Sequence, residues 1–147
     1  MNLVSNYKYI LIIFFVAATA MDALAQGRCV VTYRSLNSEV KVHAYVPEAV
    51  DEQPQFPGGD NALMRYINQE RRYPREAYCA GIEGRVLCSF IVDSDGSVSN
   101  VEVLRGVDES LNREAVRIIS GMPRWKAGTI DGGNVPVYYV LSIPFRR

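Results

Sequence analysis

The sequence predicts an α+β fold in which helices pack on a three-stranded antiparallel sheet, with an additional short hairpin near the N-terminus. Two observations lead to this prediction. Apolar residues recur at helical spacing over residues 61–69 and 111–120, whereas they alternate in the manner of strands over residues 83–105 and 135–145. Helices and antiparallel strands are therefore mixed along the chain, which is typical of α+β domains.

The composition is close to the average for globular chains. Of the 147 residues, 48% are hydrophobic and 22% are charged, which excludes a disordered chain, a collagen-like chain and a protein with several membrane spans. Sixteen basic and sixteen acidic residues give a formal charge of zero, so the charge balance does not indicate nucleic-acid binding. With three cysteines and one histidine, we expect neither a metal site nor a cofactor.

Residues 1–25 predict export of the chain. Lys8 precedes an uncharged apolar run, residues 9–21, and a small-x-small triplet follows at residues 23–25. This layout is typical of a cleaved signal peptide. The alternative is a short permanent membrane anchor, although a span needs about 20 apolar residues.

Export places the cysteines in an oxidising compartment, where they can pair. Cys79 and Cys88 either form a disulfide across the glycine-containing segment between them or remain two small buried residues. No Cys-x-x-Cys motif is present, so nothing in the sequence supports thiol redox catalysis.

An N-terminal extension, residues 26–51, precedes a domain that we place at residues 52–147. Alternating apolar residues predict a hairpin over residues 29–46, with His43 on the polar face of its second strand. A lone histidine in that position is expected to be a solvated surface residue. Residues 47–58 contain three prolines, which predicts a linker.

Two helices are predicted to follow the linker. The first covers residues 61–69, with Asp60 as its N-cap. Its apolar face has helical spacing and consists of Leu63, Tyr66 and Ile67. The second begins with Pro74 at its first position and runs through Cys79, and Gly81 is placed to end it in a left-handed turn.

The strand that begins at residue 83 is apolar on both faces, which predicts a central position in the sheet. The segment 93–96, Asp-Ser-Asp-Gly, predicts a turn to a returning strand. The same tetrapeptide also begins a calcium loop, but the remaining ligands do not follow.

A third helix, residues 111–120, is predicted with Ser110 as its N-cap. Its apolar face consists of Leu111, Ala115, Ile118, Ile119 and Met122. The last strand, residues 135–145, contains Pro136 and Pro144, each of which removes a backbone donor, so we expect an edge strand. Trp125, between the two, is expected to close the core.

The residues offer no catalytic set. A single surface histidine cannot assemble a Ser/His/Asp or Cys/His arrangement, no glycine-rich phosphate loop is present, and no pair of carboxylates stands out. The chain is therefore predicted not to be an enzyme, and binding is the function that remains.

Three separated motifs occur in order along the second half of the chain: Tyr73-Pro74-x-x-Ala77, Gly81-Ile82-Glu83-Gly84-Arg85-Val86 and Met122-Pro123-Arg124-Trp125-Lys126-x-Gly128. Together they resemble the C-terminal domain of the TonB family. The resemblance covers residues 52–147, and Pro57-Gly58-Gly59 is similar to a variant with an extended N-terminal part. The family implies two helices packed on a three-stranded antiparallel sheet.

The resemblance also implies a function. The chain looks like a TonB-like periplasmic protein that binds TonB-box segments of outer-membrane receptors by β-strand addition and serves energy-dependent transport across the outer membrane. The implied partners are TonB-dependent receptors and the ExbB–ExbD complex, with inner-membrane anchoring if residues 1–25 are retained. The alternative is a free periplasmic interaction module that is not coupled to the proton gradient. A homodimer through the last strand would use the same edge.

Two segments are expected to bind the partner. The first is the edge strand, where Tyr138 and Tyr139 are expected to tune selectivity: Val137, Tyr138, Tyr139, Val140 and Leu141. The second resembles the receptor-contact region of the family: Arg71, Arg72, Tyr73 and Pro74. Better-known members of the family have glutamine and proline in this second stretch, where this sequence has arginines.

Overall fold

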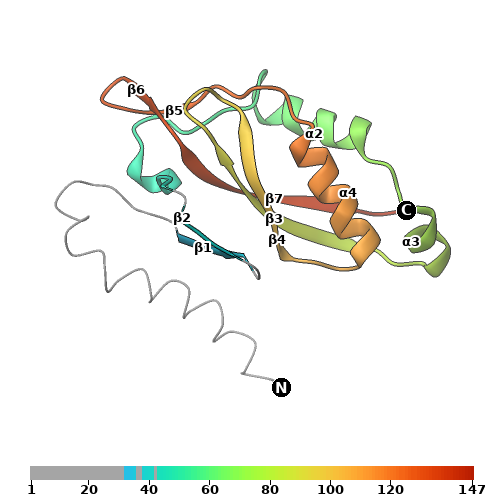
Figure 1. The fold of residues 1–147 in the computed structure, drawn as a ribbon. Helices are drawn as coiled ribbons and strands as arrows, with labels where there is room; N and C mark the ends of the chain where they lie inside the picture. Colours follow the sequence, from blue (N-terminus) through green and yellow to red (C-terminus); the bar gives the residue numbers. More distant parts are fainter. Residues whose placement is uncertain (1–31, 36–37, 42) are drawn as a thin grey trace.

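The α+β fold is confirmed by the structure, a computed structural model that describes residues 32–35, 38–41 and 43–147 (Figure 1). Residues 1–25, the expected signal segment, lie outside the described residues. The elements in chain order are β1 (Thr32–Ser35), β2 (Ser38–Lys41), the 3-10 helix η2 (Pro47–Ala49), α2 (Asp60–Glu70), α3 (Arg75–Ala80), β3 (Gly84–Val92), β4 (Val98–Arg105), α4 (Glu109–Ser120), β5 (Gly128–Ile130), β6 (Gly133–Val135) and β7 (Val137–Phe145).

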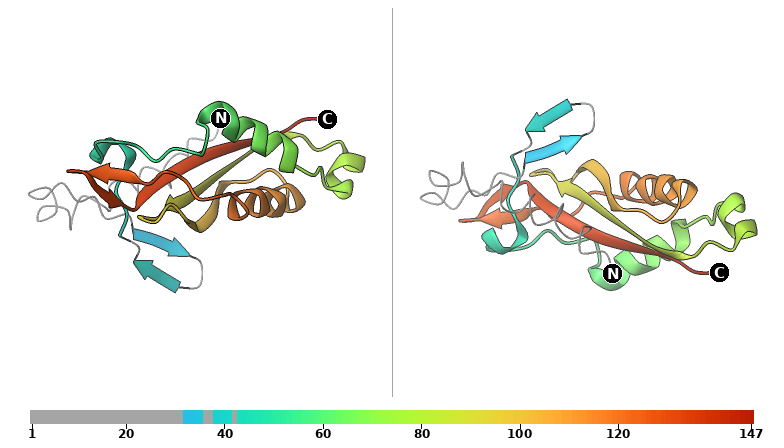
Figure 2. Two further views of the ribbon diagram at one scale, coloured as in Figure 1. Left: turned by 90° about the horizontal axis from the view of Figure 1, so that it is seen from above. Right: turned by 90° about the horizontal axis from the view of Figure 1, so that it is seen from below.

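The main sheet has the strand order β4-β3-β7, and both pairings are antiparallel. β3 is central, as its apolar residues on both faces predicted, and β7 is an edge strand. Figure 2 shows the β5–β6 ribbon extending beyond one end of this sheet and α3 lying at the opposite end. The described part of the chain has three α-helices, whereas the family resemblance implied two. The additional helix is the short α3, which lies between α2 and β3.

The core lies between the sheet and the helices α2 and α4. Leu63 and Ile67 of α2 and the predicted apolar residues of α4 pack with alternate residues of β3, the latter being Val86, Cys88, Phe90 and Val92. Trp125 is 4% exposed and meets Phe56 and Phe90 edge-on, with ring centroids 5.5 and 5.6 Å apart. Its predicted core position is confirmed.

The helix starts differ from the prediction by one or two residues. Asp60 is the first residue of α2 and caps nothing, since Gly59, with φ 79°, holds the N-cap position. For α4 the cap is Asp108, not Ser110. The extended backbone of Asp108 allows its carboxylate to accept from the Ser110 N–H at 2.9 Å. Gly81 ends α3 with φ 69°, in the predicted left-handed conformation.

The N-terminal extension holds a hairpin, as predicted, although its second strand stops earlier than expected and residues 29–31 lie outside the described residues. β1 pairs with β2 from Thr32–Lys41 to Ser35–Ser38, so the second strand ends well before residue 46. The side chain of His43 is exposed, as expected.

The predicted linker at residues 47–58 is wrong as a description of the structure. Glu52 and Gln55 form antiparallel bridges with Thr129 and Lys126, and Phe56 is only 6% exposed. Apart from the 3-10 helix η2, this proline-containing segment forms no helix or strand, yet it packs along the domain.

The last strand is divided at Pro136, which has no N–H for a sheet ladder. The part before it pairs with β5 across Asp131 and Gly132, whose φ angles are 50° and 76°. Two positive φ angles in a two-residue loop define a type I′ turn, for which Asp-Gly is a preferred pair. This dipeptide is the sequence signal for the β5–β6 hairpin, which was not among the predicted elements.

Both cysteines of the domain are free thiols. Cys79 is exposed on α3 and Cys88 is buried in β3, so the disulfide interpretation is wrong, as is a buried position for Cys79. Burial raises the pKa of Cys88 to about 11. Among the described residues, no helix has the length and apolar content to span a membrane.

Candidate functional site

The outer edge of β7 presents backbone groups that no other strand of the main sheet covers. In an antiparallel strand, each residue directs both its N–H and its C=O to the same side, and successive residues alternate between the two neighbouring strands. The Tyr138 N–H points away from β3, because it donates to the Tyr45 carbonyl at 2.8 Å. Val140 and Ser142 must therefore direct their N–H and C=O groups outward as well. Among the described residues, none makes a hydrogen bond to these groups.

The side chains of β7 alternate between the two faces of the sheet. Those of Tyr139 and Leu141 lie on the helical side and pack against the core. The Tyr139 ring is 5.5 Å from Phe90 and 5.1 Å from Trp125 between centroids. Its pKa is raised by burial and, secondarily, by the charge of Asp60. The Tyr139 ring is therefore directed toward the core, although the residue stays partly exposed.

The opposite face of β7 is only partly covered. Tyr138 packs there with Ala44 and Ile91, and burial raises the pKa of its phenol. Val140, on the same face, is 42% exposed. Val137, which lies on the other face with Tyr139 and Leu141, is fully buried. Of the five edge residues expected to bind a partner, Val140 has the most accessible side chain.

The second predicted segment, residues 71–74, lies at the far end of the same strand. Arg71 is the C-cap of α2, and its Nη1 donates to the Pro144 carbonyl at 2.5 Å. The Tyr73 hydroxyl donates to the Ile82 carbonyl, and its ring meets Phe145 edge-on at 6.0 Å. Arg71 and Tyr73 thus contact the C-terminal end of β7 at Pro144 and Phe145, beyond the residues 137–141 that are expected to bind a partner.

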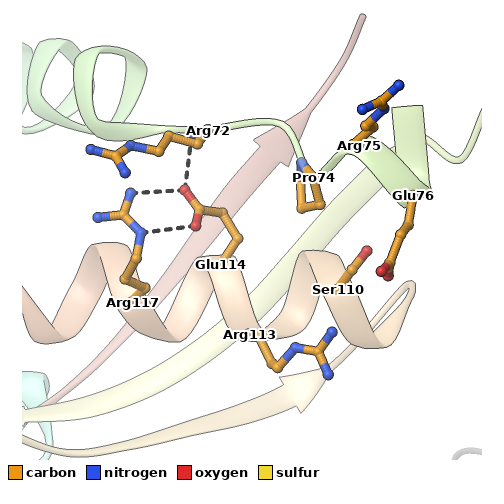
Figure 3. Close-up of a pocket in the computed structure, with 8 residues that line it drawn as sticks. All are labelled: Arg72, Pro74, Arg75, Glu76, Ser110, Arg113, Glu114 and Arg117. Carbon is orange, nitrogen blue, oxygen red and sulfur yellow. Dashed lines mark hydrogen bonds and ion pairs between the residues drawn. The ribbon is translucent and has the colours of Figure 1, made fainter. Parts of the chain in front are cut away.

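Arg72 and Pro74 line a groove of about 380 Å³ between the start of α3 and α4 (Figure 3). The other residues lining it are Arg75, Glu76, Ser110, Arg113, Glu114 and Arg117. Figure 3 shows Glu114 between the Arg72 backbone and the Arg117 guanidinium, with the side chains of Arg75 and Arg113 directed away from it.

Glu114 connects the residue 71–74 segment to α4. Its carboxylate accepts two hydrogen bonds from Arg117, both at 2.8 Å, and one from the Arg72 N–H, also at 2.8 Å. Burial raises the pKa of Glu114, but these hydrogen bonds outweigh it and hold the pKa below its ordinary value. This contact fixes the segment in place.

Tyr45, which is not among the residues predicted from the sequence to form the site, contacts the edge directly. Its N–H donates to the Pro136 carbonyl at 2.9 Å, and its carbonyl accepts from Tyr138, so that Tyr45 and Val137 form a parallel bridge. The alternation before Pro47 indicated an extended segment but not its neighbour. In the part of the chain that the structure describes, no group of metal-ligating side chains is placed to hold an ion.

Comparison with known proteins identifies relatives of this domain. Residues 69–146 match the family model described as Gram-negative bacterial TonB protein C-terminal. The protein TonB of Helicobacter pylori strain J99 is 38% identical over 58 residues, which are 39% of this chain and 21% of that protein. The protein TonB of Pseudomonas aeruginosa PAO1 is 36% identical over 64 residues, 43% of this chain and 18% of the relative. The match thus spans about a fifth of each relative's length.

Solved structures of the same kind are also similar. The solution structure of the Helicobacter pylori TonB C-terminal domain aligns with a TM-score of 0.46 and 27% identity, over 58% of this chain and 90% of that chain. That of the Pseudomonas aeruginosa domain gives a TM-score of 0.38 and 29% identity, over 52% and 77%. Since the family model covers both β7 and residues 71–74 and more than half of the sequence, the chain belongs to the family of Gram-negative bacterial TonB C-terminal domains.

Proposed function

We propose that this domain binds TonB-box segments of outer-membrane receptors by taking them up as an extra strand on the outer edge of β7. In that role it serves energy-dependent transport across the outer membrane from the periplasm. Coupling to the ExbB–ExbD complex belongs to this proposal only if the N-terminal apolar segment is retained as an anchor.

The observation that carries the proposal is the outward direction of the Val140 and Ser142 backbone, with no hydrogen bond to it among the described residues. An exposed strand edge offers alternating donors and acceptors to a guest strand, and main-chain pairing of this kind supplies affinity with little demand on side chains. The neutral formal charge of the chain is compatible with such binding.

A labelled TonB-box peptide titrated against the full chain tests the proposal. The decisive variant is Val140→Pro, which removes an outward N–H and no hydrogen bond to β3. Pro144, two outward positions further along, shows that this strand accepts proline in such a place. Losing one backbone hydrogen bond and leaving a guest carbonyl unpaired is expected to weaken binding about tenfold.

Val140→Thr is the matched control, since it keeps both the N–H and the β-branched shape, and its affinity is expected to stay within about twofold of the original. Unchanged affinity in Val140→Pro, with its stability verified by thermal unfolding, would show that the guest does not pair with β7.

The alternative, a free periplasmic interaction module, differs in its N-terminus and not in its edge. The mass of the exported protein separates the two proposals. A mature chain that has lost residues 1–25 rules out direct coupling to ExbB–ExbD, whereas an intact N-terminus supports it. Sedimentation over a range of concentrations tests whether two copies pair through β7 instead.

A further inference from the structure

The first part of the β7 edge is already occupied by the chain itself. Tyr45 makes two backbone hydrogen bonds there, at 2.9 Å to the Pro136 carbonyl and at 2.8 Å from the Tyr138 N–H. The preceding residue, Ala44, is 2% exposed and packs on Ile91 and Tyr138. Tyr45 therefore forms a single parallel bridge with Val137, at the place where a fourth strand would begin.

Pro47 explains why this strand goes no further. In a parallel ladder the residue after next along the incoming strand donates the next hydrogen bond. Residue 47 would have to donate to the Tyr138 carbonyl, and proline has no N–H. The chain turns away instead, since the Ala49 N–H donates to the Val46 carbonyl at 3.0 Å and η2 begins.

The other end of the edge is limited by Arg71. Its guanidinium donates to the outward carbonyl of Pro144, and Pro144 itself has no N–H to offer. Between Tyr138 and Pro144, only Val140 and Ser142 have outward backbone groups. The stretch from residue 138 to residue 144 is about 20 Å long at about 3.4 Å per residue.

We propose that Tyr45 and Arg71 delimit the guest-binding part of the edge, so that it accepts an extended segment of about five residues, and that Pro47 keeps this window open. The proposal rests on the proposed function, strand addition to β7, and specifies which guests it takes. A longer guest strand has to displace Tyr45 and expose Ala44, or leave the sheet.

The test uses the full chain and a receptor TonB-box peptide synthesised in lengths from about three to about nine residues. With the unmodified protein, affinity is expected to rise with length and to level off near about five residues. In Tyr45→Pro, which loses the N–H to Pro136, the rise is expected to continue to longer peptides, with about a fivefold gain for the longest. Tyr45→Phe keeps the backbone contact and is expected to behave like the unmodified protein.

A second measurement judges the self-pairing without any guest. Amide hydrogen exchange at Tyr138 is expected to be slow in the unmodified protein and in Tyr45→Phe, and at least about tenfold faster in Tyr45→Pro. If the affinity of the unmodified protein keeps rising to the longest peptide, or if Tyr138 exchange is the same in all three proteins, the delimited window is wrong. If no peptide binds to any of them, the proposed function fails, and Tyr138 exchange alone then decides whether Tyr45 covers the edge.

Discussion

Arg71 and Pro144 are 73 residues apart in the sequence, yet the Nη1 atom of Arg71 donates a hydrogen bond to the Pro144 carbonyl at 2.5 Å. This contact joins the C-terminal end of α2 to the C-terminal end of the edge strand. It also places the positive charge of Arg71 at the Pro144 carbonyl, the last outward carbonyl of β7 that a guest strand would reach. Arg71 therefore has a defined structural role.

Replacing Arg71 by alanine is expected to lower the free energy of unfolding by about 1 kcal/mol, since a part-buried hydrogen bond from a charged donor is lost while water replaces it at the carbonyl. Urea unfolding measures the change. Arg71→Lys retains a donor of similar reach and is expected to lose less than half as much. Equal losses in the two variants would contradict a hydrogen-bonding role for this side chain.

The stability contributed by Glu114 is expected to depend on pH. Its pKa is lower in the folded chain than its ordinary value of 4.5, so the ionised form stabilises the fold. That stabilisation is fully present above about pH 4.5 and is lost as the pH falls through the lower, folded pKa. The measurement is the difference in unfolding free energy between the unmodified protein and Glu114→Gln at neutral pH and at about pH 3.

The difference is expected to be largest at neutral pH and to shrink in acid, where the carboxyl group of Glu114 becomes protonated and loses its ion pair with Arg117. Glu109→Gln is the matched control, because Glu109 pairs with Arg113 on the exposed surface. Solvent screening leaves such pairs with little net effect on stability, so this variant is expected to change the unfolding free energy little at either pH. A Glu114→Gln difference that does not change with pH would contradict the assignment.

Gly96 cannot be replaced without disturbing the backbone around Trp125. Its φ is +84°, and a Cβ atom built on it would lie 2.0 Å from the Trp125 carbonyl oxygen. The Gly96 carbonyl also accepts a hydrogen bond from the Trp125 N–H at 2.8 Å. Gly96→Ala is therefore expected to lower the free energy of unfolding by about 3 kcal/mol or more, through steric overlap and backbone strain.

Gly132→Ala is the matched control for Gly96. Its φ of +76° is similarly positive, but a Cβ there meets nothing within 4 Å, so only the backbone cost of about 1 kcal/mol is expected. Thermal or urea unfolding of both variants separates the steric term from the conformational one. Similar losses at the two glycines would mean that the contact with Trp125 costs nothing.

The two cysteines of the domain are expected to differ in reactivity. Cys79 is exposed, whereas Cys88 is buried with a pKa of about 11, and the reactive species is the thiolate. In a Cys29→Ser background, maleimide is expected to modify one thiol of the native protein, and Cys79→Ser is expected to abolish this labelling. Mass spectrometry before and after unfolding measures it. Rapid native labelling of Cys88 would contradict its position in the core.

Much of the fold could be predicted because it depends on residues that are close in the sequence. The spacing of Leu63 and Ile67 identifies the buried face of α2, Gly81 ends α3, and the two faces of β3 are apolar because the strand is central. Pro144 marks β7 as an edge strand because a proline cannot donate to a second neighbour. The errors at the helix starts also have local causes. At α4, for example, both Asp108 and Ser110 are residue types that cap helices, and Asp108 is the one that does so.

The site could be predicted only in part. By itself, the sequence determined the three α-helices, the strands of the main sheet with their central and edge positions, and the two segments expected to bind a partner, but not the β5–β6 hairpin. Only the tertiary structure decided that Arg71 reaches Pro144, that Tyr45 lies beside Val137, and that Tyr139 turns its ring into the core. The physical reason is that spacing along the chain encodes which face of an element is apolar, whereas contacts between distant residues depend on how complete elements dock and on which backbone groups docking leaves uncovered.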